Sequence, residues 1–164
     1  MKLPEVIMKK EVDALRSKII ERVDKYGYTF VYVGASKTTP SFVYTVGLAK
    51  KSFPEIIAFD LEHSLAQGII CDVVNEWAKL GTHRVGIYPD LVTLVGGQPC
   101  NCEINIVTSE EVIEKYVRLT RHVLDIDHYH VAQLTPSDLS GRSISDPDFK
   151  NDVNMFILPS VKIN

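Results

Sequence analysis

The sequence has few cysteines, no long apolar run and no excess of basic charge, and each shortage excludes a class of protein. Three cysteines are too few for the disulfide framework of a small secreted domain, so reduced thiols are expected. No stretch approaches the roughly 18 uninterrupted apolar residues of a membrane helix. The net charge of −3 argues against a basic face for nucleic acid, because phosphate binding relies on clustered Lys and Arg. We therefore expect a cytoplasmic protein without nucleic-acid or membrane partners.

Short catalytic and nucleotide-binding motifs are also missing. The sequence contains no GxxxxGK[ST] phosphate loop and no GxGxxG, GxSxG or HExxH motif. What is present is an ordinary globular composition, with 164 residues, 45% hydrophobic and 24% charged. A chain of that length can bury a core without disulfides or metals. We expect a single globular domain over residues 1–164.

Apolar residues at helical spacing predict three helices. The first covers about residues 10–25, the second covers 61–80 with Asp60 as its N-cap, and the third runs from Thr108 to about Leu124. The apolar positions of the first helix are Val12, Leu15, Ile19, Ile20 and Val23. Those of the second are Leu65, Ala66, Ile69, Ile70, Val73, Val74 and Trp77, a stripe wide enough to indicate deep burial.

Segments rich in β-branched and aromatic residues predict strands. They are residues 28–33, 42–46, 56–59, 84–88, 91–95, 102–107, 131–134 and 155–158. Residues 102–107 alternate, with Cys102, Ile104 and Ile106 on one face and Glu103 and Asn105 on the other. Because the strands come in consecutive groups, we predict an α+β fold with a mostly antiparallel, barrel-like sheet, with a split barrel as one form of it. A polar loop, 135–152, has a length typical of functional or disordered segments.

Two sequence blocks carry a family resemblance. The first is FVYTVGL at residues 42–48, followed by PEII at 54–57; the second is Gln133-Leu134, DLSGR at 138–142 and Asp146-Pro147. The first resembles the "PxFAYTVGL…HPELIV" opening of the domain-of-unknown-function 4262 family, and the second resembles that family's "LQLVWPDRDGRFPWDP" block. The resemblance covers about residues 27–158. It implies a fold and no established activity.

A second, fold-level resemblance concerns the order of strand, YTVGL segment, strand and helix. This order is similar to the opening of flavin-reductase-type split barrels. In those proteins a strand end and the following helix N-terminus receive the flavin phosphate. Our expectation is a protein without a cofactor, and the resemblance implies flavin as the alternative.

The first block and the helix after it supply four candidate ligand-binding residues, Tyr44, Thr45, Gly47 and His63. Thr45 offers a hydroxyl, and Gly47 lets a ligand or backbone approach closely. His63 lies in the first helical turn, where free N–H groups favour anions. The alternatives are a strand threonine, a glycine that opens a turn, and a histidine bonded to a neighbouring carboxylate.

The second block supplies Gln133, Asp138 and Arg142. An arginine with nearby carboxylates can clamp an anionic ligand, or it can pin its own loop by ion pairs. If the two blocks met in space, Arg142 and Thr45 would line one pocket.

His128 and His130 would share a face if residues 128–130 formed a strand, with Asp125, Asp127 and Glu103 nearby in the sequence. No third ligand has diagnostic spacing, so we expect no metal. Cys100 and Cys102 lack the two-residue spacer of zinc and redox pairs, and Cys71 is expected to be an inert core residue.

These observations favour a small-molecule binding protein whose pocket takes a phosphorylated or nucleotide-like ligand. It would sequester the ligand, sense it or act on it. The alternatives are a flavin-dependent reductase on a split barrel and a protein-interaction module without a ligand. The residues leave open whether the protein is an enzyme, and a homodimer is an expected assembly.

Overall fold

The computed structural model describes residues 3–93, 99–151 and 155–159, and within them one six-stranded sheet forms the centre. The strands are β1 (Thr29–Val33), β2 (Phe42–Val46), β3 (Glu55–Phe59), β4 (Gly86–Thr93), β5 (Pro99–Val107) and β6 (Val131–Pro136). They lie in the order β1-β2-β3-β6-β5-β4. All neighbours pair antiparallel except β3 and β6, which run parallel. The α+β class and the mostly antiparallel sheet are confirmed, and the sheet is open rather than closed into a barrel.

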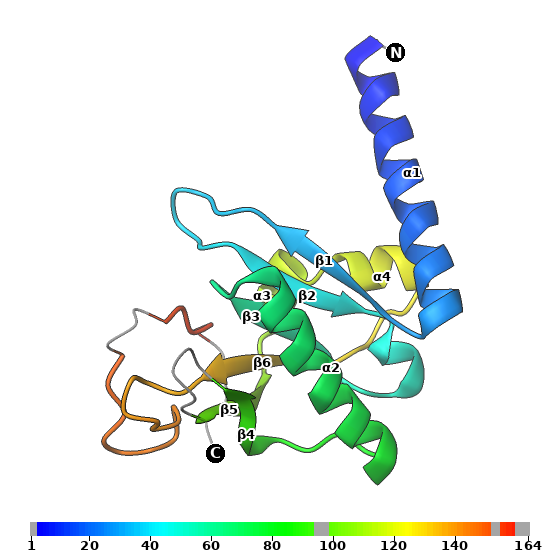
Figure 1. Cartoon of the computed structure of the whole chain (residues 1–164). Coiled ribbons are helices and arrows are strands. Elements are labelled where there is room, and N and C mark those ends of the chain that lie inside the picture. Colours follow the sequence, from blue (N-terminus) through cyan, green and yellow to red (C-terminus); the bar gives the residue numbers. More distant parts are fainter. Residues whose placement is uncertain (1–2, 94–98, 152–154, 160–164) are drawn as a thin grey trace.

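Helices cover both faces of the sheet (Figure 1). They are α1 (Leu3–Tyr26), the 3-10 turn η1 (Leu48–Lys51), α2 (His63–Leu80), α3 (Glu110–Tyr116) and α4 (Leu119–Leu124). On the α2 face, Ile56 and Ala58 of β3 join one hydrophobic cluster. On the other face, Ile57 and Phe59 join a second cluster with α3, α4 and the end of α1. Because this central strand is buried on both faces, its residues 56–59 form a continuous apolar run.

The helix predicted over 61–80 begins two residues later, and its N-cap is Glu62 rather than Asp60. The Glu62 carboxylate accepts hydrogen bonds from the backbone N–H groups of Ser64, at 3.0 Å, and Leu65, at 2.9 Å. Asp60 adopts a left-handed φ of 52°, and its N–H donates to Ser41 at 2.8 Å, which ends the strand. The predicted apolar stripe of α2 is buried except for Leu65, which is exposed at the helix start.

Helix α1 and strand β5 begin earlier than predicted, at Leu3 and Pro99, and three other predicted elements change in number or type. The third helix is split into α3 and α4, because Val117 leaves the helical conformation with φ −120° and ψ 48°. The strands predicted at 84–88 and 91–95 merge into β4, with a register shift between Tyr88 and Val92 at Pro89-Asp90. Residues 94 and 95 lie outside the described residues. The segment 155–158 is not a strand.

Helix α1 extends away from the rest of the structure, and only its last turns pack on it (Figure 1). Ile19 and Val23 are buried, whereas Val12 is 61% and Leu15 50% exposed. The prediction that all these positions form one core face is therefore wrong for the first two. Among the described residues no helix, α1 included, is long and apolar enough to cross a membrane.

Trp77 is the largest fully buried side chain, and its removal tests the α2 face of the core. Its Nε1 donates to the Tyr88 hydroxyl at 2.7 Å, and its ring packs against Phe53 at 5.7 Å between centroids. We expect Trp77→Ala to lower the free energy of unfolding by roughly 3–5 kcal/mol, as large-to-small aromatic changes in cores do. Chemical denaturation measures the loss, with the exposed Leu80→Ala as control; a loss below about 1 kcal/mol would contradict this packing.

Candidate functional site

The first sequence block is organised around the carboxyl group of Glu55, which is fully buried at the start of β3. The Thr45 hydroxyl donates to Glu55 Oε2 at 2.6 Å, and the backbone N–H groups of Gly47 and Ala49 donate to Oε1 at 2.9 and 3.1 Å. Thr45 Oγ1 also accepts from the Ile56 N–H at 2.9 Å. Thr45 and Gly47 therefore use their polar groups to hold Glu55.

Burial raises the pKa of the Glu55 carboxyl from its ordinary 4.5 to about 7, against the opposing effect of its hydrogen bonds. The donors are a hydroxyl and backbone N–H groups, which stabilise the charged form less than a cation would. Among the described residues, Glu55 forms no ion pair with a basic side chain. The group can therefore change its charge near neutral pH.

Gly47 is required by a close approach between chain segments. Its φ is 126°, and a Cβ there would lie 2.6 Å from the carbonyl oxygen of Gly27 and 2.7 Å from Cα of Tyr28. Any side chain would push this turn away from the start of β1. Gly47 therefore sets the position of Tyr28. Glu55 contributes to this, because its carboxyl group accepts a hydrogen bond from the Gly47 N–H.

Tyr44 and His63, the other candidates of this region, are not among the hydrogen-bond donors to the Glu55 carboxyl group. Tyr44 is buried among the residues of the α3–α4 face, and burial raises the pKa of its phenol. His63 is exposed at the start of α2, and its ring lies 3.9 Å from the Tyr32 ring between centroids. The neighbouring Glu62 carboxylate bonds the N–H groups of Ser64 and Leu65 at the helix start.

The second block is organised around Asp138, which is also buried. Its Oδ1 accepts from the N–H groups of Ser140 and Arg142, both at 2.9 Å. Its Oδ2 accepts from Arg142 Nε at 2.9 Å and from the Lys150 N–H at 3.0 Å. Burial would raise the pKa of Asp138, but these bonds outweigh burial and lower it to about 2. Of the two interpretations of Arg142, the geometry matches the loop staple.

Gln133 holds the chain after the loop. Its Nε2 donates to the Phe156 carbonyl at 2.7 Å, and its Oε1 accepts from the Leu158 N–H at 2.9 Å. The amide therefore replaces strand pairing for the segment predicted as a strand over 155–158.

The two blocks occupy opposite ends of β6. Val131, its first residue, pairs with Glu55, whereas Asp138 lies two residues beyond its last. At about 3.3 Å per residue, the stretch from Val131 to Asp138 spans roughly 20 Å. Thr45 bonds Glu55 at the start of β3, whereas Arg142 follows the end of β6. Because β3 and β6 run parallel, their starts lie together, so Thr45 and Arg142 lie at opposite ends of this strand pair and do not line the expected single pocket.

A cavity of about 530 Å³ lies instead where the end of α1, the start of β1 and the middle of α2 meet. Sequence reasoning did not single out this set as a site. Two sequence patterns could have indicated that these residues lie together. Tyr28 and Phe30 alternate in the strand predicted over 28–33, and Gln67 and Cys71 lie four residues apart on a helix. The cavity is lined by Arg22, Tyr26, Tyr28, Thr29, Phe30, Gln67 and Cys71.

Cys71 is half-buried in this cavity and is not the inert core residue that was expected. Its sulfur accepts a hydrogen bond from the Tyr28 hydroxyl at 3.3 Å. Burial, and then this contact with Cys71, raises the pKa of Tyr28. The phenol therefore remains a hydrogen-bond donor at physiological pH. Cys102 is buried, and the side chain of Cys100 lies outside the described residues.

His128 and His130 line a second cavity, of about 430 Å³, at the start of β6. They are not on a strand, because β6 begins at Val131, yet both border the same space together with Tyr129 and Glu110. The described residues contain no group of three or more His, Cys, Asp or Glu placed to hold a metal ion.

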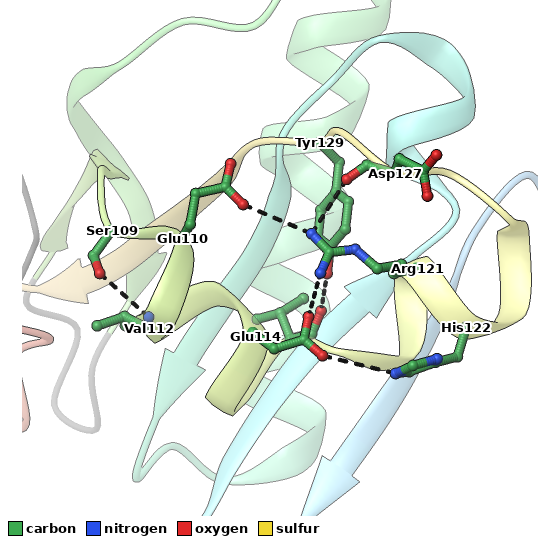
Figure 2. Close-up of polar contacts among 9 residues, drawn as sticks. Ser109, Glu110, Val112, Glu114, Arg121, His122, Asp127 and Tyr129 are labelled. Carbon is green, nitrogen blue, oxygen red and sulfur yellow. Dashed lines mark hydrogen bonds and ion pairs between the residues drawn. The ribbon is translucent and has the colours of Figure 1, made fainter.

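Figure 2 shows the ion-pair network beside this second cavity. The Arg121 guanidinium lies 2.6 Å from the Glu114 carboxylate and 3.7 Å from that of Glu110, and it donates to the Asp127 carbonyl at 3.2 Å. Tyr129 donates to the Val117 carbonyl at 2.5 Å, and burial raises the pKa of its phenol to about 12. These contacts fix the loop that carries the histidines.

Comparison with known proteins identifies the family. A family described as "Domain of unknown function (DUF4262)" matches residues 22–150, so the chain belongs to this family. The resemblance seen in the sequence is thereby confirmed, and the matched region begins five residues earlier and ends eight residues earlier than the expected range of 27–158. No curated protein and no solved structure matches the chain.

The raised pKa of Glu55 predicts a pH dependence of stability. Between about pH 4.5 and pH 7 the folded protein keeps a proton that the unfolded chain has lost, so the free energy of unfolding falls as pH rises through this window. The slope from one such group is at most about 1.4 kcal/mol per pH unit. We expect Glu55→Gln to flatten this slope in denaturation measured at several pH values. The exposed Glu111→Gln is the control; an unchanged slope in Glu55→Gln would contradict the assignment.

Metal independence is predicted for the pair His128 and His130. Treatment with a chelator should leave the melting temperature unchanged, because a structural metal would contribute its binding free energy to folding. Thermal unfolding with and without EDTA, followed by added zinc, measures this. A large fall that zinc reverses would show that the histidines hold a metal.

Proposed function

We propose that the protein binds a small phosphorylated, nucleotide-like molecule, and that the cavity between α1, β1 and α2 receives it. The observation that carries this proposal is the combination of aromatic walls and a cation in one space of about 530 Å³. That volume lies within the roughly 300–1,000 Å³ typical of ligand pockets. This proposal keeps the ligand class expected from the sequence and assigns it to different residues.

The aromatic walls suit a planar base. Tyr28 and Phe30 pack edge to face, with ring centroids 5.6 Å apart, and both remain partly exposed toward the cavity. Tyr26 is 65% exposed beside them. Stacking of a base on an aromatic ring contributes roughly 1–3 kcal/mol and tolerates different bases. Exposed aromatic rings around a concave surface are unfavourable in water, and such surfaces commonly mark binding sites.

The positive charge suits a phosphate. Arg22 lines the cavity and also a neighbouring one of about 220 Å³, which Lys18 and Lys25 border. Among the described residues, Arg22 forms no ion pair. A guanidinium offers the paired N–H groups that match phosphate oxygens. A base between the tyrosines would therefore direct its phosphate toward Arg22.

Hydrogen-bonding groups on α2 suit a base edge. The Gln67 carboxamide provides both a donor and an acceptor at the cavity wall, one helical turn from Cys71. Gly47 and Glu55 support the opposite wall, because Gly47 contacts Tyr28 and Glu55 fixes Gly47. The first sequence block thus supports this proposal by shaping the cavity and without touching the ligand.

The projecting part of α1 favours self-association as a second property. Val12 and Leu15 are exposed on a helix that leaves the body of the protein, and Arg22 lies on the same helix. Native mass spectrometry of the purified protein gives both the assembly and any retained molecule. A dimer with a retained nucleotide supports both properties, whereas a yellow protein with bound flavin favours the reductase alternative.

Binding of adenosine monophosphate tests the cavity directly. We expect calorimetric titration to show saturable binding that Arg22→Ala weakens about tenfold or more, since hydrogen bonds to charged groups contribute roughly 1.5–3 kcal/mol. Arg16→Ala, an exposed arginine on the same helix outside the cavity, is the matched control. Equal affinities of the two variants would contradict the assignment of Arg22. The absence of binding for both adenosine monophosphate and riboflavin phosphate would contradict the ligand class.

A further inference from the structure

A row of polar side chains lies buried on the sheet face opposite α2. Glu103 of β5 pairs with Thr135 of β6, and Asn105 pairs with Gln133, so all four side chains point to the same side. Their exposed fractions are 1% or less. The neighbours on this face, Ile57 among them, are apolar. Burying four polar groups there is unfavourable unless each is paired.

Pairing within this row is incomplete. The Glu103 carboxylate accepts from Asn105 Nδ2 at 2.6 Å and from the Ser145 hydroxyl, both neutral donors. Among the described residues no basic side chain forms an ion pair with Glu103. Asn105 Oδ1 is buried and accepts no hydrogen bond from any described residue. A buried carboxylate next to an unused acceptor is a site that lacks donors and positive charge.

A loop contacts the Glu103 end of the row, while Phe156 and Leu158 bond to Gln133 at its other end. Residues 138–150 contain no helix or strand, and Asp138 holds both ends of this segment by accepting from Arg142 at one end and Lys150 at the other. Between these ends, Ser145 reaches Glu103. Compact loops with closely held ends are frequently functional. The ends of this one can stay fixed while Ser145 leaves the carboxylate.

We propose that the row of Glu103, Asn105, Gln133 and Thr135 is a second binding site, for a small organic cation with N–H donors such as a primary ammonium or a guanidinium, and that residues 138–150 close over it. The cation would replace the Ser145 hydroxyl at Glu103 and donate a further N–H to Asn105 Oδ1. One group would then supply both the positive charge that Glu103 lacks and the N–H donor that Asn105 Oδ1 lacks. This site is independent of the nucleotide cavity, which lies on other elements.

The test uses the full chain, labelled with ¹⁵N, and three salts at equal ionic strength. Ethylammonium and ethylguanidinium chloride carry N–H donors, whereas tetraethylammonium chloride carries none. We expect either of the first two to shift the side-chain amide signals of Asn105 and Gln133 in a saturable way. Tetraethylammonium should not. Arg22→Ala should leave these shifts unchanged, which separates this site from the nucleotide proposal.

Three variants test the roles of Glu103 and Ser145. Glu103→Gln keeps the shape and removes the charge, so it should weaken cation binding about tenfold or more. Ser145→Ala removes the competing hydroxyl and should tighten binding several-fold, whereas Ser140→Ala, an exposed serine of the same loop, should not. Tightening in Ser145→Ala is a result that a purely structural role of Ser145 would not produce. It can be read even if Glu103→Gln fails to fold.

The proposal is overturned by the absence of saturable shifts in both the wild-type protein and Ser145→Ala. In that case the row holds only water, and Asn105 Oδ1 bonds to it. Equal shifts with tetraethylammonium would also overturn it, because they would indicate a general salt effect.

Discussion

The buried carboxyl group of Glu55 is the contact on which the rest of the structure depends. Its side chain holds Thr45 at the end of β2 and the N–H groups of Gly47 and Ala49, and its own N–H donates to the His130 carbonyl at 2.9 Å. Five segments meet there: the turn after α1, β2, η1, β3 and the start of β6. The carboxyl group of Glu55 thus supports the wall of the aromatic cavity, and its backbone N–H holds the loop with the histidines.

Asp138 likewise holds several backbone groups at the other end of β6, but its pKa is lowered where that of Glu55 is raised. Burial dominates at Glu55, whose donors are neutral, and its pKa rises to about 7. At Asp138 three backbone N–H groups and the Arg142 guanidinium overcome burial, and its pKa falls to about 2. One carboxyl group is therefore sensitive to pH near neutrality and the other stays charged. The polar residues of both sequence blocks serve mainly to build these two centres.

Local patterns were sufficient to predict most helices and strands and insufficient to predict the site. The apolar spacing of α2 located Trp77 in the core, because a periodic stripe reports burial directly. The alternation of residues 102–107 separated Glu103 from Ile104 correctly, but it did not indicate that the face of Glu103 is buried as well. The sequence of a strand does not indicate whether a loop elsewhere in the chain packs against it.

The cavity of Arg22, Tyr28 and Gln67 was beyond sequence reasoning for a related reason. Its three elements, α1, β1 and α2, meet only after the sheet has formed, and no pattern within one of them reports the other two. The roles of Thr45 and Gly47 were invisible as well, since their partner Glu55 reads in sequence as an ordinary exposed residue. Nothing local indicates that a carboxyl group is buried.

The parallel pairing of β3 with β6 sets an order for folding. Glu55 pairs with Val131, so the central contact of the sheet joins residues far apart in the chain, and α2, β4, β5, α3 and α4 intervene. Strands β1 to β3 can form hairpins as they leave the ribosome, but one edge of β3 stays unpaired until β6 has been synthesised. Contacts of such long range slow folding and leave an exposed edge open to other chains. The newly made protein therefore depends on β6 to close the centre of the sheet.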